Sequence, residues 1–137
     1  MPIPNLQAYG ELLYSLQECY SSIQHSTLVL ITIGPTLAQV EGQVTFANGA
    51  VLDVWELLDL EAGRILNYSY EVYRSDEKVL WYDPFEHAHT PELASTFPHH
   101  KHVLPDIRHN RVPAPGISFE EPNLPFLIDE IARDKLQ

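Results

Sequence analysis

The sequence predicts a single α+β domain over residues 1–137, built around an antiparallel β-sheet. Three observations predict it: apolar residues recur every second position between residues 38 and 82, helical periodicity appears near both ends, and turn residues separate the alternating stretches. A chain of 137 residues suits one hydrophobic core. We therefore expect a β-meander of about five strands packed against an N-terminal helix, then a proline- and histidine-rich loop and a short C-terminal helix.

The N-terminal helix is predicted to begin after Asn5, whose side chain is a good helix cap. Apolar residues then recur at intervals of three and four, which places them on one face of a helix. That face should pack on the sheet. Its residues are Leu6, Tyr9, Leu13, Leu16 and Tyr20.

The first strands follow from β-branched residues and strict alternation. Thr27 to Ile33 reads as a strand that ends at Gly34-Pro35. Residues 38–46 alternate apolar and polar side chains, which is typical of a strand with one buried face. Asn48-Gly49 then predicts a type I′ hairpin turn, because both central positions of that turn need positive φ. Val51 to Leu58 should be the returning strand.

Two further strands complete the predicted meander. A turn at residues 61–63 leads into Arg64 to Arg74, and a turn at residues 75–77 leads into Val79 to Tyr82. Because strands that follow one another in sequence usually pair, all of these strands should be antiparallel neighbours. On the longer strand, one face should carry Leu66, Tyr68, Tyr70 and Val72.

No sustained periodicity appears from Asp83 to Pro122, where most of the eleven prolines fall. A segment of this length without elements of its own is uncommon in a compact domain unless it is functional. After it, Asn123 is positioned to cap a closing helix. The apolar face of that helix consists of Leu124, Leu127, Ile128 and Ile131.

Charge and cysteine content bear on whether the chain binds nucleic acid, forms a disulfide or crosses a membrane. The formal net charge is −11, which opposes non-specific binding to nucleic acid. Between residues 99 and 111, however, Lys101, Arg108 and Arg111 stand with four histidines against one aspartate. The single cysteine excludes an intramolecular disulfide, and the longest apolar stretch is too short to cross a bilayer. We therefore expect a cytoplasmic location.

Six of the seven histidines lie between residues 87 and 109, and their side chains allow three kinds of role. The first is metal binding. His87 and His89, or His99 and His102 with a carboxylate such as Asp83 or Glu86, offer nitrogen and oxygen ligands that suit a divalent metal such as zinc. Because the HExxH motif is absent, the spacing alone does not select this role over one without any cofactor.

The second role is acid–base catalysis on RNA, in which one imidazole accepts the 2′-hydroxyl proton and another protonates the departing oxygen. Lys101, Arg108 or Arg111 would then stabilise charge on the phosphate. The third role is structural, with imidazoles hydrogen-bonded to backbone carbonyls. Aromatic residues offer a base-stacking surface that includes Tyr73, although aromatics at every second position are more often core residues.

One run of residues resembles a known family. Asn67-Tyr68-Ser69-Tyr70, then Tyr82-Asp83, and above all Phe97-Pro98-His99-His100-Lys101-His102 are similar to the TumE family of toxins from bacterial toxin–antitoxin systems. The similarity runs from about Thr27 to Val103. It implies a growth inhibitor that is neutralised by a cognate antitoxin, often a DNA-binding protein. Ribonuclease activity is the usual activity of small toxins of this build, and that implication is an analogy.

The resulting hypothesis is a toxin whose possible substrate is RNA. We expect no membrane partner. His99, His100 and His102 are the acid–base candidates, Lys101 is a phosphate contact and Asp83 is an orienting or ligand carboxylate. Substrate contacts are assigned to Arg108, Arg111 and Tyr73, and metal ligands to His87 and His89. Two alternatives stay open: a metal-dependent hydrolase or nuclease, and a non-enzymatic protein-interaction module. A homodimer is also open.

Overall fold

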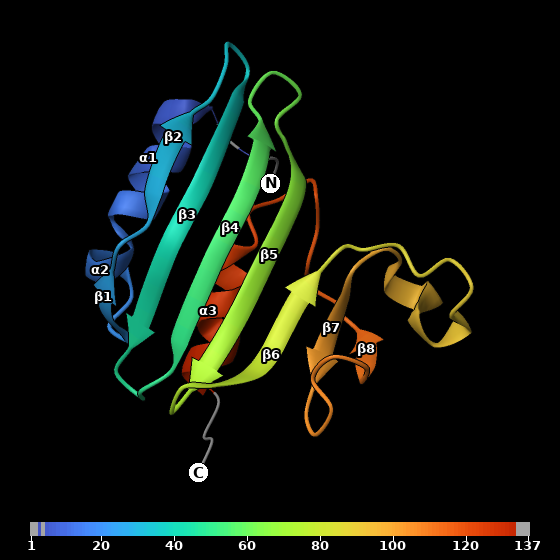
Figure 1. The fold of residues 1–137 in the computed structure, drawn as a ribbon. Coiled ribbons are helices and arrows are strands. Elements are labelled where there is room, and N and C mark those ends of the chain that lie inside the picture. The colour runs from blue at the N-terminus through green and yellow to red at the C-terminus, as the bar shows by residue number, and fades with distance from the viewer. Residues whose placement is uncertain (1–2, 4, 134–137) are drawn as a thin grey trace.

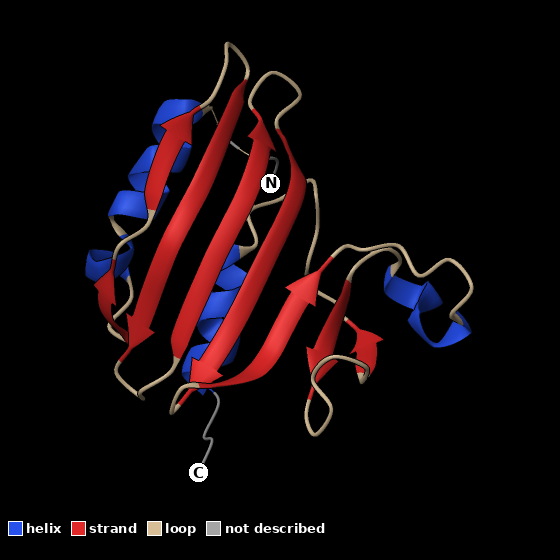
Figure 2. Ribbon diagram, viewed as in Figure 1, coloured by secondary structure: helices blue, strands red, loops and turns tan. Residues whose placement is uncertain are grey.

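A computed structural model describes residue 3 and residues 5–133 of the chain. Its described strands form one sheet, in which every pairing is antiparallel and the order is β1-β3-β4-β5-β6-β7-β8, with β2 also paired to β3 (Figures 1 and 2). The predicted α+β class is confirmed, but there are eight strands rather than about five. They are β1 (Ile23–Ser26), β2 (Val29–Thr32), β3 (Leu37–Phe46), β4 (Val51–Asp59), β5 (Arg64–Arg74), β6 (Glu77–Asp83), β7 (His100–Val103) and β8 (Arg111–Pro113).

The N-terminal helix begins as predicted but is shorter. The backbone N–H of Ala8 donates to Oδ1 of Asn5 at 2.9 Å, so Asn5 caps α1 (Leu6–Tyr14). The helix is interrupted at Ser15, and a single turn, α2 (Leu16–Cys19), follows. Tyr9, Leu13 and Leu16 are buried, whereas Leu6 is 40% exposed at the end of the stripe.

The predicted strand from Thr27 to Ile33 is shorter than expected, because the chain bends at residues 27 and 28 between β1 and β2. At this bend the backbone passes close to Gly42 of β3. A Cβ atom at Gly42 would lie 2.6 Å from the carbonyl oxygen of Thr27, and its φ is +139°. Glycine is therefore required at this point of the sheet.

The type I′ turn lies at a different hairpin from the predicted one. Asn48 does not have positive φ; only Gly49 does, and the Phe46 carbonyl accepts from its N–H at 3.0 Å. The side-chain carbonyl of Asn48 instead accepts from the N–H of Ala50 at 3.0 Å. Both Ser75 and Asp76 have positive φ (49° and 65°), as that turn type demands.

A register shift in β5 corrects the predicted buried face. The pairing of β4 with β5 is irregular between Leu57 and Leu58, so the side-chain alternation changes at this point. Ile65 is consequently buried and Leu66 is 41% exposed, although Tyr68, Tyr70 and Val72 occupy the core as predicted.

The segment expected to lack regular structure contains a 3₁₀ helix, η1 (Pro91–Thr96), and the strands β7 and β8. These strands have four and three residues, which is too short for a hydrophobic period to appear in the sequence. Pro113 ends β8 at the edge of the sheet, where a missing N–H breaks no interior ladder. Short strands therefore place the histidine run within the sheet.

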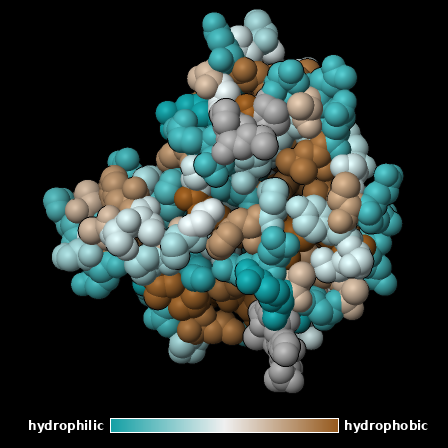
Figure 3. Space-filling view, turned by 180° about the vertical axis from the view of Figure 1, so that it is seen from behind, coloured by the Kyte–Doolittle hydropathy of each residue, from teal (hydrophilic) through white to brown (hydrophobic). Residues whose placement is uncertain are grey.

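The closing helix, α3 (Leu124–Arg133), buries the four apolar residues predicted for its inner face. Asn123 does not cap it as expected: its side-chain oxygen accepts from the N–H of Ser118, and its amide donates to the Tyr70 hydroxyl at 3.0 Å. Seen from the side of this helix, the surface shows apolar patches among polar side chains (Figure 3). None of the described helices has the length and apolar character needed to cross a membrane.

The two faces of the sheet have different surroundings. Side chains such as Leu52, Val54 and Leu58 of β4 are buried on the face that α3 covers (Figure 1). Residues between them in the sequence, such as Trp55, point to the opposite face because side chains alternate along a strand. Trp81 of β6 and Ser69 of β5 share that opposite face, where their side chains are hydrogen-bonded.

Candidate functional site

The candidate site forms where β6 ends beside β7. Asp83 is the last residue of β6 and is the register partner of His100, while Trp81 is the partner of His102. Since residues two apart on a strand point to the same face, His100 and His102 project together on the side of Asp83. The His-Lys-His sequence therefore brings two imidazoles to one carboxylate.

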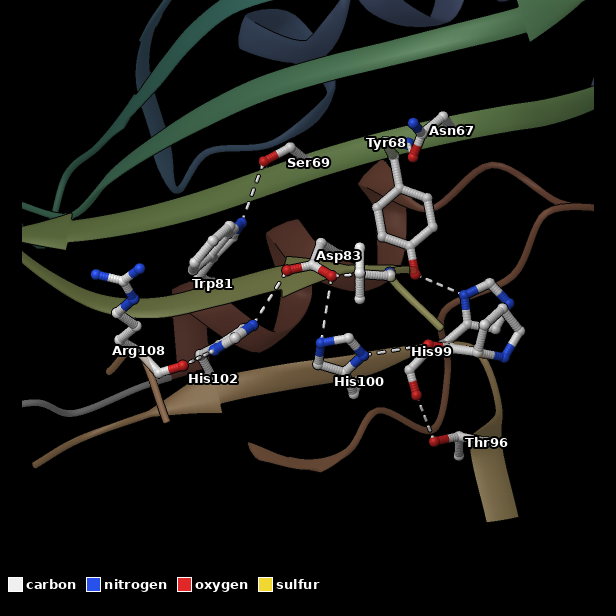
Figure 4. Close-up of polar contacts among 12 residues, drawn as sticks. Asn67, Tyr68, Ser69, Trp81, Asp83, Thr96, His99, His100, His102 and Arg108 are labelled. Carbon is white, nitrogen blue, oxygen red and sulfur yellow. Dashed lines mark hydrogen bonds and ion pairs between the residues drawn. The ribbon is translucent and has the colours of Figure 1, made fainter. Parts of the chain in front are cut away.

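The two imidazoles contact different oxygens of that carboxylate (Figure 4). Nε2 of His100 lies 3.2 Å from Oδ1 of Asp83, and Nε2 of His102 lies 3.1 Å from Oδ2. His100 is 1% exposed and His102 is 3% exposed. The backbone N–H of Phe85 donates to Oδ1 at 2.9 Å, which fixes the orientation of the carboxylate.

The other ring nitrogen of each histidine faces the backbone. Nδ1 of His100 lies 3.1 Å from the carbonyl oxygen of Pro98, and Nδ1 of His102 lies 3.2 Å from that of Arg108. A carbonyl oxygen can only accept a hydrogen bond, so each Nδ1 carries the proton. Both rings are therefore held at their two nitrogens.

Burial and charge act in opposite directions on the pKa values of Asp83 and His102. Burial alone would raise the pKa of Asp83, but the close contact with the His100 ring, the N–H of Phe85 and the charge of the two imidazoles together lower it. For His102, burial lowers the pKa and outweighs the stabilising carboxylate of Asp83. Shifted pKa values are common at functional sites.

His99, the third histidine of the run, has a separate environment. Its Nδ1 lies 2.5 Å from the Tyr68 hydroxyl, and its ring packs against Phe119 with centroids 4.6 Å apart. Burial raises the pKa of Tyr68, aided by the charge of Asp83, and burial also lowers the pKa of His99. His99 thus connects the loop to the core residue Tyr68 and does not contact Asp83.

A cavity of about 790 Å³ opens beside the cluster on the face away from α3. Trp81 lies in its wall and stacks on His102 with ring centroids 4.4 Å apart. Its indole N–H donates to the Ser69 hydroxyl at 3.2 Å, which holds the ring in place. The remaining wall is a mixture of aromatic, cationic and acidic side chains, including Trp55, Asn67, Tyr68, Phe85, Glu86, His87, Arg108, Arg111 and Phe119.

Two arginines give the cavity positive charge. Arg111 of β8 is the register partner of His102, so the two side chains are neighbours across the strands, and Arg108 lies in the loop between them. Among residue 3 and residues 5–133, neither arginine forms an ion pair with a carboxylate. Both guanidinium groups are available to bind an anion.

Two predicted site residues lie elsewhere. Lys101 points to the opposite face of β7, where its Nζ lies 5.8 Å from the centre of the Tyr82 ring and 4.0 Å from Glu130. Tyr73 lies near the β5–β6 turn, where Lys78 contacts its ring at 6.0 Å. Neither lines the cavity next to Asp83.

The two predicted metal ligands, His87 and His89, lie in different surroundings. His87 lines the cavity, and its ring packs edge-on against that of His100 with centroids 4.8 Å apart. His89 is exposed two residues later. In the described part of the chain, the group of three or more potential metal ligands is Asp83, His100 and His102, and it includes neither His87 nor His89.

The sequence did not single out Trp81 as a site residue, although the structure places it in the cavity wall. A signal was present, because Trp81 and Asp83 are two residues apart and belong to one face of a strand. The alternation of His100 and His102 is the same signal on the next strand. Only the β6–β7 pairing, which the sequence did not reveal, shows that the two faces coincide.

Comparison with known proteins agrees with the resemblance. Residues 14–135 match the family model described as Toxin TumE, and this range covers most of the chain. It extends beyond the strands and the histidine run to include all of α3 and part of the N-terminal helical region. No curated protein and no solved structure matches the chain.

Proposed function

The chain belongs to the TumE family of toxins, and from this premise we propose that it is a bacterial toxin that cleaves RNA in the cytoplasm. Membership in a toxin family implies an antitoxin partner. We propose that this partner is a DNA-binding protein and that it suppresses the activity described below.

The observation that carries the proposal is the pair of arginines beside the Asp83 cluster. Arg108 and Arg111 line one cavity with His102, and neither is paired with a carboxylate in the part of the chain that the structure describes. A phosphodiester is the anion that best suits such a pair, because guanidinium groups bind phosphate oxygens with two parallel hydrogen bonds. Asp83 and Glu86 also line the cavity, so the phosphate would bind at the two guanidinium groups and not to the cavity as a whole.

The aromatic wall supports a nucleic acid with unpaired bases as the substrate. Trp55 and Trp81 line the cavity together with the two arginines. A base can stack on an indole ring whatever its sequence, and such stacking contributes about 1–3 kcal/mol per base. Single-stranded RNA has phosphates that the two arginines can bind and unpaired bases that can stack on the aromatic wall.

RNA has an internal nucleophile, the 2′-hydroxyl. Once its proton is removed, the 2′-oxygen attacks the adjacent phosphorus, and the bond from phosphorus to the 5′-oxygen breaks as that oxygen takes up a proton. His87 and His102 are imidazoles that line the cavity, and we assign them to the two proton transfers. Oδ2 of Asp83 accepts from Nε2 of His102 when that ring carries a second proton, which holds the ring in position. Arg111, the neighbour of His102, would stabilise the charge that develops on the phosphate.

The test is induction in a bacterial host, with growth and RNA integrity measured with and without the gene adjacent to that of the toxin. Arg111→Ala should relieve the growth arrest and the RNA cleavage, whereas Arg133→Ala, on α3, should not. Growth arrest with intact RNA would show that the substrate assignment is wrong. Equal effects of both substitutions would show that the cavity is not the site.

A further inference from the structure

The Asp83 cluster contains groups that converge without a hydrogen-bond donor between them. One ligand atom from each of Asp83, His100 and His102 lies within 4.8 Å of the others. A carboxylate only accepts hydrogen bonds. A neutral imidazole has one N–H, and in both histidines that proton lies on Nδ1, facing a backbone carbonyl. Each Nε2 therefore directs a lone pair toward a carboxylate oxygen.

Such an arrangement is repulsive unless a positive species lies between the three groups. Among the described residues, Nε2 of His100 is fully buried and has no hydrogen-bond partner, although it lies 3.2 Å from Asp83. A buried polar atom without a partner is rare in proteins, and one that lies beside two other potential ligands indicates a functional role. Either an additional proton or a metal ion would satisfy it.

The surrounding contacts favour the metal. Histidines that bind metals usually donate their other N–H to a backbone carbonyl or carboxylate, which fixes the tautomer and the orientation of the ring. The carbonyls of Pro98 and Arg108 occupy that position for both histidines. The N–H of Phe85 similarly orients the carboxylate. All three side chains are thus held before any ligand binds.

The distances also fit a small metal ion. Zinc lies at about 2.0–2.2 Å from nitrogen and oxygen ligands, so neighbouring ligands in a tetrahedral site are about 3.3 Å apart. The observed separations between the carboxylate oxygens and the two Nε2 atoms are 3.2 Å and 3.1 Å. A metal ion could therefore bind with small adjustments of the side chains.

We propose that Asp83, His100 and His102 form a binding site for one divalent transition metal ion, of which zinc is the reference case. Two imidazoles and one carboxylate suit zinc, cobalt or iron, whereas magnesium and calcium prefer oxygen ligands. Three protein ligands leave one coordination position of a tetrahedral metal open. Since Asp83 and His102 line the cavity, that position would face the cavity.

The use of this metal in RNA cleavage rests on the proposed function, but its binding does not. With a metal bound, His102 is a ligand and no longer a proton-transfer group. Metal binding thus replaces the proton-transfer role of His102 and leaves the proposed roles of the two arginines and His87 unchanged. The proposed site also differs from both ligand sets predicted from the sequence. His87 and His89 are not part of the site, and His100 takes the place of His99 beside Asp83 and His102.

The experiment uses tag-free protein that has been freed of metal with a chelator and then titrated with Zn²⁺, Co²⁺ or Mg²⁺. One Zn²⁺ or Co²⁺ per chain should bind, with visible absorption for the cobalt protein, and Mg²⁺ should not compete. His100→Ala should weaken Zn²⁺ binding by at least about 100-fold, because loss of a ligand should cost no less than loss of an outer-shell partner. His109→Ala, which removes an exposed histidine, is the matched control.

A second measurement needs no substitution. Nitrogen NMR of the intact protein should show Zn²⁺-dependent shifts of Nε2 in His100 and His102, with Nδ1 protonated throughout. The absence of stoichiometric binding, or equal weakening by His109→Ala, would overturn the metal site. RNA cleavage by metal-free protein would overturn a catalytic role for the metal alone, and bound metal with intact RNA would overturn only the proposed function.

Discussion

Two carboxyl groups, Glu56 and Asp83, lie on opposite faces of the same sheet, and their partners differ in kind. Glu56 is 0% exposed on the helix-covered face and accepts from the hydroxyls of Tyr9 at 2.7 Å and Tyr70 at 2.5 Å. Asp83 is partly buried and faces two imidazole nitrogens whose protons lie on the far side of each ring. Both hydroxyls donate to the first carboxyl group, whereas the second accepts from the N–H of Phe85 and otherwise meets ring nitrogens without protons.

This difference separates a structural cluster from a functional one. The Glu56 cluster is complete, because Tyr9 joins α1 to β4, and Tyr70 receives a further hydrogen bond from Asn123 next to α3. Nothing further needs to bind there. The Asp83 cluster is incomplete and lies beside a cavity, so it is suited to bind a further species. Changes in the first should affect stability, and changes in the second should affect activity.

The largest expected effect is that of Glu56→Ala. It leaves a cavity and two buried hydroxyls without their acceptor, so we expect the free energy of unfolding to fall by about 4 kcal/mol. Equilibrium unfolding in urea measures this change. Glu41→Ala, at an exposed position of β3, should change it by less than about 0.5 kcal/mol. Similar losses for both variants would contradict a structural role for Glu56.

Asp83→Asn should have the opposite profile. Asparagine keeps the shape of the side chain and an acceptor for the N–H of Phe85, but it removes the negative charge. We expect RNA cleavage, or growth arrest if cleavage is not the activity, to fall by about 100-fold, since loss of a group that holds a catalytic imidazole or a metal in position costs about 10–100-fold. The free energy of unfolding should change by less than about 1 kcal/mol. Full activity of Asp83→Asn would contradict a functional role for the Asp83 cluster.

Tyr9→Phe tests a single donor to Glu56. It leaves one oxygen of a buried carboxyl group without its partner, so the free energy of unfolding should fall by about 1.5 kcal/mol, with activity retained per folded molecule. Tyr14→Phe is the control on the same helix: Tyr14 is 59% exposed, and the Leu30 N–H that its hydroxyl accepts from can bind water instead. An equal loss of unfolding free energy in Tyr14→Phe would contradict a specific role for the hydrogen bond between Tyr9 and Glu56.

The smallest effect is a pH dependence. Burial raises the pKa of Glu56 above its ordinary value of 4.5, and the hydrogen bonds from Tyr70 and Tyr9 offset only part of that change. The folded state therefore holds the proton to higher pH than the unfolded chain. Stability should fall as pH rises from 4.5 through the raised pKa, because the unfolded state loses its proton first.

Urea unfolding of the parent protein and of Glu56→Gln across pH 5 to about 8 measures this effect. The glutamine variant cannot titrate at this position, so the difference in unfolding free energy between the two proteins should change with pH in the direction given. A constant difference would indicate that the pKa of Glu56 is the same in the folded and unfolded states.

The sequence predicted the fold class because long elements carry long patterns. Residues 38–46, Arg64 to Arg74 and the inner face of α3 are long enough for alternation or helical periodicity to be unambiguous. The bulge beside Leu66 and the strand β7 could not be predicted in the same way. A bulge changes the period by one residue, and four residues are too few to define a period.

The candidate site was predicted in part for a related reason. Asp83, His100 and His102 were chosen by residue type, and all three meet in the structure. Lys101 was chosen by its place in the run, although alternation along a strand directs it to the other face. Its role could be corrected only once residues 100–103 were known to form a strand. Arg108 and Arg111 were identified by charge, and their place in the cavity depends on the β7–β8 pairing.

The His-Lys-His spacing on β7 has a genetic consequence. Inserting one codon between those for His100 and His102 would preserve the reading frame and both histidines, yet it would exchange the faces of every residue after it. One imidazole would then be replaced beside Asp83 by another side chain. Insertion of two codons would restore the alternation. Natural variation in this stretch should therefore tolerate even changes in length better than odd ones.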